Sequence, residues 1–191
     1  MNLPNTLTVI RIILAPLFFA AFFFTKWTAT GHIASLIVLV IVFVVMELSD
    51  FLDGYFARKY QLVTEIGKVI DPFGDVLSRM TYFFCFTLTG LMPAWIFLIL
   101  LYRELGITFL RMLMIRRGIA MAASIWGKAK AVTYAAGGVL GLLYTISIRL
   151  DPSLGFLPTL KGITLIVFIL GAISSVLSFI TYIRTAASDL R

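Results

Sequence analysis

The feature that most constrains this chain is a succession of long apolar stretches. An α-helix needs about 20 mostly apolar residues to cross the hydrocarbon core of a bilayer. Six stretches of roughly this length occur, at residues 7–24, 33–56, 66–89, 93–115, 129–148 and 163–183. Apolar residues make up 61% of the 191 residues, more than one soluble core of this size can bury. The sequence therefore predicts an all-α protein, a bundle of six transmembrane helices that forms a single membrane-embedded domain over residues 1–191.

The basic residues indicate how this bundle is oriented. The net charge is +7, but the cations are spread along the chain beside apolar stretches, a pattern typical of membrane flanks rather than of a nucleic-acid-binding surface. In the six-helix arrangement one side collects Arg58, Lys59, Lys68, Arg116, Arg117, Lys128, Lys130, Arg184 and Arg191, and the other only Lys26, Arg149 and Lys161. Because cytoplasmic loops carry the excess of Lys and Arg, we expect both termini to be cytoplasmic, in a multi-pass protein of the inner membrane.

Four aspartates form the main chemical signal. The chain has only nine acidic residues, yet Asp50, Asp53, Asp71 and Asp75 gather at the expected cytoplasmic ends of the second and third stretches. A carboxylate at membrane depth costs about 2.5 to 3.5 kcal/mol on insertion scales, so four together need compensating cations. Bound metal ions would supply that charge.

The spacing of these aspartates supports a metal site. Asp50 and Asp53 are three residues apart and Asp71 and Asp75 four apart, which places each pair on one face of its helix. Two facing pairs would form a cage of four carboxylates, with ligands for two ions. Oxygen ligands without Cys or His favour Mg²⁺ or Mn²⁺ over zinc.

Small residues and an arginine accompany the acids. Gly54 and Ala57 follow Asp53, and Gly67 lies one turn before Asp71, so a substrate could approach the helices closely there. Arg58 offers a planar fork that suits phosphate oxygens. Together these residues are typical of a diphosphate site. The alternative is that the small residues only allow tight helix packing.

These residues also form a recognisable motif, in which Asp50 is followed by Asp53-Gly54, Ala57-Arg58, Gly67, Asp71 and Asp75. The motif resembles the signature of the CDP-alcohol phosphotransferase family at every position and in both gap lengths. The resemblance implies a six-helix fold, a homodimer, and two divalent ions held by the four aspartates. It further implies that Asp75 is the base that takes the proton from the attacking alcohol, and that Gly54, Arg58 and Thr64 contact the CDP-linked substrate.

Other segments resemble the members of this family that combine CDP-diacylglycerol with glycerol 3-phosphate in the lipid bilayer. The resemblance rests on Pro4-Asn5, Leu7-Thr8, Arg11, Arg103-Glu104, Thr108, Arg111, Gly118, Ala123-Ser124, Gly127-Lys128 and Lys130. Asn5 and Thr8, at the headgroup level of the first stretch, are candidates for contact with the nucleotide, although Asn5 could equally cap a helix. In these enzymes a Lys usually follows the last aspartate. Here Val76 follows Asp75, and the nearest cation is Arg79, one turn on.

Cations in the fourth and fifth stretches indicate the acceptor. Arg103 and Arg111 are about 80° apart around a helix. Lys128 and Lys130 bring further positive charge to the same side. This surplus would bind an acceptor bearing a phosphate, such as glycerol 3-phosphate, with Arg103, Arg111 and Lys128 as the predicted contacts. Glu104 could instead neutralise one of them. Inositol phosphate, serine, inositol and choline remain alternative acceptors, and an ion transporter is the competing class.

Overall fold

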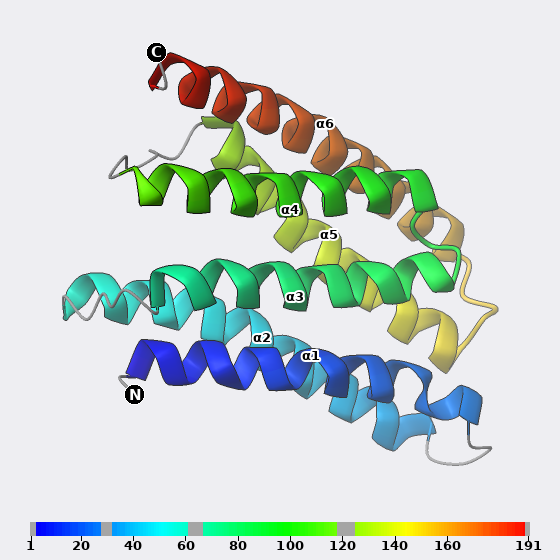
Figure 1. Cartoon of the computed structure of the whole chain (residues 1–191). Coiled ribbons are helices and arrows are strands. Elements are labelled where there is room, and N and C mark those ends of the chain that lie inside the picture. The colour runs from blue at the N-terminus through cyan, green and yellow to red at the C-terminus, as the bar shows by residue number, and fades with distance from the viewer. Residues whose placement is uncertain (1–2, 28–31, 61–66, 118–124, 190–191) are drawn as a thin grey trace. The chain divides into compact units, whose positions relative to one another are not determined.

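The computed structural model describes residues 3–27, 32–60, 67–117 and 125–189, and within these ranges the chain forms six helices and no strand (Figure 1). The helices are α1 (Leu3–Trp27), α2 (His32–Lys59), α3 (Gly67–Leu88), α4 (Ala94–Arg116), α5 (Ile125–Leu150) and α6 (Leu157–Asp189). Each of the six predicted stretches coincides with one of these helices. The prediction of an all-α protein is therefore confirmed.

Four of the described helices are long and apolar enough to cross a membrane. Their apolar segments are Asn5–Phe24, His32–Asp53, Ile125–Leu150 and Leu157–Ala187, in α1, α2, α5 and α6. Large apolar side chains such as Ile13, Ile33 and Val132 are exposed on these helices, as lipid-facing residues are. The chain is therefore a multi-pass membrane protein. That α3 and α4, which carry several charged residues, also cross the bilayer remains a prediction.

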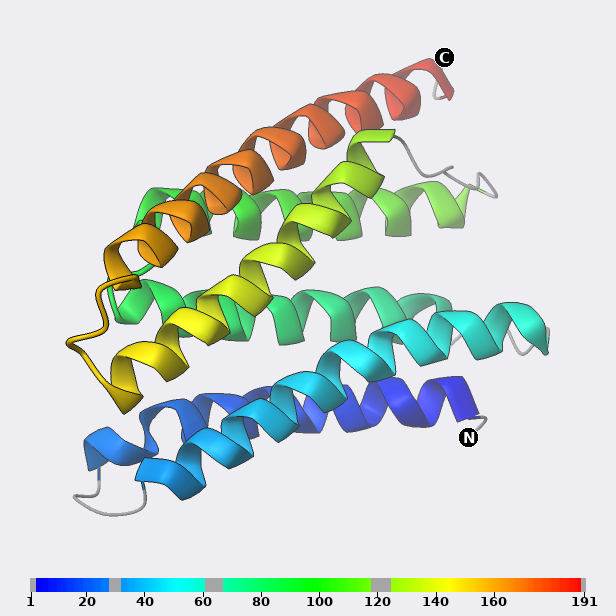
Figure 2. The same cartoon turned by 180° about the vertical axis from the view of Figure 1, so that it is seen from behind.

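The chain divides into two compact units, Met1–Cys85 and Phe86–Arg191. In the first unit α2 lies alongside α1 in both views (Figure 1, Figure 2). Aromatic rings connect the three helices of this unit. The rings of Phe18 in α1, Phe43 in α2 and Tyr82 in α3 lie 5.4 to 6.3 Å apart in tilted or edge-to-face pairs, and all three are buried. Such pairs contribute about 0.5–1.5 kcal/mol each beyond the area they bury.

In the second unit α6 packs against both α4 and α5. Hydroxyl groups link α5 to α6: the Tyr134 hydroxyl is 2.9 Å from Ser175 Oγ, and Thr133 Oγ1 is 3.3 Å from Ser174 Oγ. A helix pair in lipid gains little from the hydrophobic effect, so such hydrogen bonds and close packing hold it together. Gly141 of α5 lies close to a different side chain, because a Cβ at that position would lie 2.4 to 2.8 Å from carbons of the buried Phe86 ring.

A short turn ends α3 and leads into α4. Gly90 adopts φ 73°, a left-handed conformation that glycine adopts without steric cost, and its N–H donates to the Thr87 carbonyl at 3.0 Å. The sequence predicts a turn here from Gly90 and Pro93.

Candidate active site

The four predicted aspartates lie on two helices of the first unit. Asp50 and Asp53 are in the last third of α2, and Asp71 and Asp75 are in the first half of α3. Asp53 is buried, and the other three are partly buried. Hydrogen bonds from α1 connect both pairs to common partners, so the four carboxylates lie in one region of the first unit.

Arg11 of α1 is the residue on which three of these carboxylates meet. Its side chain is 1% exposed, and its Nη1 donates to Asp50 Oδ1 at 2.8 Å. The same guanidinium forms ion pairs with Asp53 and Asp75. In the sequence Arg11 belongs only to the resemblance described above and has no predicted role. A cation within the first apolar stretch was the available signal, since an arginine at membrane depth almost always has an acidic partner.

Thr8, one turn before Arg11, contacts the remaining aspartate. Its Oγ1 is 2.6 Å from Asp71 Oδ1 and 3.4 Å from Asp53 Oδ2. A hydroxyl has one proton to donate, and the shorter distance assigns it to Asp71. Gly74 allows this approach of α1 to α3, because a Cβ at that position would lie 2.8 Å from Thr8 Cγ2. Thr8 and Arg11 together contact all four aspartates from α1.

A second arginine reaches the cluster from α3. Arg79 Nη2 donates to Asp50 Oδ2 at 2.5 Å. Each oxygen of Asp50 therefore accepts from a different guanidinium, Oδ1 from Arg11 and Oδ2 from Arg79. In the sequence Arg79 was only the nearest cation after Asp75. The four aspartates and two arginines form what we call the carboxylate cluster.

The carboxylate cluster has the donor set that a hard divalent cation requires. Its ligands would all be carboxylate oxygens, which suit Mg²⁺ or Mn²⁺, and three of the four carboxylates already face one buried positive charge. In the described part of the chain, however, no group of three or more Asp, Glu, His or Cys side chains has the arrangement that holds a metal ion. Arg11 would have to share these carboxylates with a metal ion or withdraw from them. The predicted cage with two ions thus stays a prediction.

The structure places only some of the residues predicted to bind the CDP-linked substrate. Asn5 is buried on α1, one turn before Thr8, and Gly67 is the buried first residue of α3. Gly54, Ala57 and Arg58 belong to the last turns of α2, but their side chains lie outside the described part. Thr64 lies outside the described residues altogether. The predicted contacts with the nucleotide remain untested.

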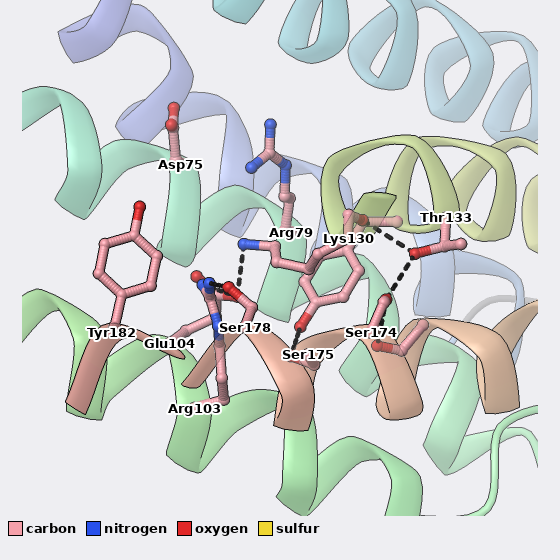
Figure 3. Close-up of polar contacts among 12 residues, drawn as sticks. Asp75, Arg79, Arg103, Glu104, Lys130, Thr133, Ser174, Ser175, Ser178 and Tyr182 are labelled. Atoms are coloured by element: carbon pink, nitrogen blue, oxygen red, sulfur yellow. Dashed lines mark hydrogen bonds and ion pairs between the residues drawn. The ribbon is translucent and has the colours of Figure 1, made fainter. Parts of the chain in front are cut away.

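The second unit contains a separate group of buried charges (Figure 3). Glu104 Oε1 accepts from Arg103 Nη1 at 3.0 Å and from Lys130 Nζ at 2.6 Å. Arg103 Nη2 also donates to Ser178 Oγ of α6 at 2.7 Å. All three charged side chains are buried, and they carry two positive charges against one negative charge. We call Arg103, Glu104 and Lys130 the charged triad.

The charged triad shares only Arg103 with the predicted acceptor site of Arg103, Arg111 and Lys128. Lys130, which the sequence indicated as part of the positive surplus but not as one of the three contacts, is buried against Glu104, whereas Lys128 is exposed. Arg111 pairs with Tyr182 of α6: its Nη2 is 3.2 Å from the hydroxyl and its guanidinium lies 5.6 Å from the ring centre. The alternative that Glu104 neutralises Arg103 agrees with their ion pair.

The fold and the two charged clusters define a class of protein. It is a multi-pass helical membrane protein in which acidic and basic side chains form ion pairs within the helices. Such residues are costly in lipid and mark functional sites. The sequence model of the CDP-alcohol phosphatidyltransferase family matches residues 1–188, and the chain belongs to this family.

Named relatives agree with this assignment. A CDP-diacylglycerol–glycerol-3-phosphate 3-phosphatidyltransferase of Treponema pallidum is 31% identical over 97% of this chain and 89% of its own length. A protein of the same name from Bacillus subtilis is 34% identical over 68% of this chain and 70% of its own. A probable phosphatidylglycerophosphate synthase of Mycobacterium tuberculosis is 34% identical over 74% of this chain and 65% of its own.

Proposed function

We propose that this protein transfers the phosphatidyl group of CDP-diacylglycerol to glycerol 3-phosphate, giving phosphatidylglycerophosphate and CMP. The observation that carries the proposal is the similarity to a relative named for this activity, which extends over 97% of the chain. The carboxylate cluster supports it, because transfer between phosphate oxygens is catalysed by carboxylate-bound divalent ions in many enzymes.

In the proposed reaction, the hydroxyl oxygen of glycerol 3-phosphate attacks the phosphorus that carries the diacylglycerol. The bond from this phosphorus to the oxygen that bridges to CMP breaks, and CMP leaves with that oxygen. Asp75 takes the proton of the attacking hydroxyl. Asp50, Asp53, Asp71 and Asp75 would hold two divalent ions, Mg²⁺ or Mn²⁺, whose charge neutralises the diphosphate and the departing CMP.

Other residues would bind the two substrates. Arg58 would hold two oxygens of the diphosphate with its planar fork, beside the small residues Gly54, Ala57 and Gly67. We further propose Thr64, Asn5 and Thr8 as contacts of the CDP-linked substrate.

The phosphate of glycerol 3-phosphate is assigned to the cations of α4 and α5. Arg103, Arg111 and Lys128 are the proposed contacts, and Lys130 joins them because the triad carries two positive charges and one negative charge. An acceptor without a phosphate, such as serine, inositol or choline, would bring no phosphate oxygens to these cations, which disfavours it.

The proposal includes a place and an assembly for the protein. The excess of Lys and Arg on one side of the helices supports six crossings of the inner membrane, with both termini and the active site facing the cytoplasm. Membership of the family supports a homodimer.

The test measures CMP release by purified protein with CDP-diacylglycerol, Mg²⁺ or Mn²⁺, and a panel of acceptors. Glycerol 3-phosphate should support turnover, and Asp50→Asn, Asp53→Asn and Asp71→Asn should each abolish it, because an amide is a neutral and poorer metal ligand. Asp151→Asn, in the exposed α5–α6 connection, is the matched control and should retain activity. Near wild-type turnover of any of the three variants would contradict the metal role.

The acceptor assignment has its own variant. Arg111→Ala should raise the KM for glycerol 3-phosphate about ten- to a hundredfold and leave that for CDP-diacylglycerol nearly unchanged, because a charge-assisted hydrogen bond contributes about 1.5–3 kcal/mol. Lys161→Ala, an exposed residue of α6, serves as the control. If serine, inositol, inositol phosphate or choline is used efficiently while glycerol 3-phosphate is inert, the acceptor is wrong and the reaction class stands.

A further inference from the structure

Arg79 belongs to the carboxylate cluster but has no part in the proposed reaction. It lies on α3 one turn after Asp75, and its side chain is 19% exposed. Its Nη2 donates to Asp50 Oδ2 at 2.5 Å, while Asp50 Oδ1 accepts from Arg11 at 2.8 Å. Asp50 is thus held on both oxygens, by one guanidinium from α1 and one from α3. A carboxylate held on both oxygens cannot rotate without breaking a charged hydrogen bond.

The surroundings of Arg79 are also acidic. Asp75 lies one turn before Arg79 on α3, and Glu47 lies one turn before Asp50 on α2, so acidic residues of two helices attract the guanidinium charge. A mostly buried cation that is attracted from two helices can impose an orientation on its partner, which a mobile surface cation cannot.

We infer that Arg79 is a positioning residue for metal binding, which fixes the Asp50 carboxylate in the orientation that holds a divalent cation. This inference rests on the proposed function, in which Asp50 is a metal ligand. Hydrogen bonds to ligating carboxylates orient them, and removing such partners typically lowers metal affinity about 10- to 100-fold.

Simple charge neutralisation by Arg79 leads to the opposite expectation. If Arg79 acted only through its positive charge, its removal would make the cluster more negative and tighten cation binding. If Arg79 orients Asp50, its removal weakens binding despite the gain in negative charge. The sign of the change in affinity separates the two roles.

The experiment measures Mn²⁺ binding to the purified full chain in detergent by electron paramagnetic resonance, without substrate. Arg79→Met, which removes the charge and the hydrogen bond, should weaken Mn²⁺ affinity about 10- to 100-fold. Arg79→Lys keeps the charge without the planar fork and should show a smaller loss in the same direction. Arg184→Met, an exposed arginine of α6, is the matched control and should bind as the wild type does. Unchanged or tighter binding by Arg79→Met overturns the inference.

Two further measurements separate this result from the proposed function. Asp50→Asn should lose Mn²⁺ binding; if it binds Mn²⁺ as the wild type does, or if the wild type binds none, the metal site itself is wrong and the inference falls with it. Thermal unfolding without metal shows whether each variant is folded. If Arg79→Met does not fold, Arg79→Lys and Arg79→Gln replace it in the test. If both of these variants fold and bind Mn²⁺ with the wild-type affinity, the inference is overturned.

Discussion

Replacing Glu104 by Gln should destabilise the protein by about 3 kcal/mol. Glu104 is the carboxylate shared by Arg103 Nη1 at 3.0 Å and Lys130 Nζ at 2.6 Å, and all three side chains are buried. Removing one partner of a buried ion pair costs about 3–5 kcal/mol, because the other charge is left uncompensated. The lower end of this energy range applies here, because each cation retains another interaction. Arg103 still donates a hydrogen bond to Ser178 at 2.7 Å, and Lys130 Nζ still lies 4.5 Å from the centre of the Tyr134 ring.

The assay is thermal unfolding of the purified protein in detergent. For a chain of this size, 1 kcal/mol shifts Tm by about 2–4 °C, so Glu104→Gln should lower Tm by about 6–12 °C. Lys161→Gln, at an exposed lysine, is the control and should leave Tm unchanged. Adding Lys130→Met to Glu104→Gln should recover part of the loss, because one of the two uncompensated cations is removed. A Tm of Glu104→Gln within 2 °C of the wild-type value, equivalent to about 1 kcal/mol or less, would refute the reasoning.

Two other predictions concern the second unit. Gly141→Ala should lower the free energy of unfolding by about 1–3 kcal/mol, because its Cβ would lie 2.4 to 2.8 Å from three carbons of the buried Phe86 ring. Gly162→Ala, with open space around it, is the control and should not destabilise the protein. Thermal unfolding measures both. In the α5–α6 connection, hydrogen bonds from the Ser153 hydroxyl and N–H hold the pKa of Asp151 below its usual range. Their contribution to stability is present above the ordinary carboxyl pKa and is lost as the pH falls through the lowered value. Ser153→Ala should raise the Asp151 pKa in an NMR titration; an unchanged value would contradict this.

The positions of the helices could be predicted from the sequence because apolar length alone determines them. The stretch 33–56, for example, became α2 (His32–Lys59). The ends were less accurate, most of all for α6, which runs from Leu157 to Asp189 rather than over 163–183. The helix continues at both ends through polar residues such as Thr159 and Arg184. A prediction from hydropathy alone therefore makes the helix too short.

The partners of the charged residues were harder to predict than the residues themselves. The aspartates stood out because acids are scarce and their spacing repeats a helical turn. Arg11 did not, because its partners are 39 to 64 residues away in the sequence. Lys128 and Lys130 are about 200° apart around α5, so only one of them could face Glu104. The sequence offers no means to choose between them, and in the structure it is Lys130 that contacts Glu104.

The pairing of Arg11 with three aspartates has a consequence for how the chain is inserted during synthesis. An arginine at the centre of a single apolar helix opposes partition into the bilayer by about 2.5–3.5 kcal/mol, and Arg11, in the first half of the Asn5–Phe24 segment, adds part of this cost. Its partners Asp50 and Asp75 are translated 39 and 64 residues later, on α2 and α3. We therefore expect the nascent α1 to remain beside the translocon, or at the membrane surface, until those helices emerge. The first three helices would then enter the lipid as a set, with their charges already matched.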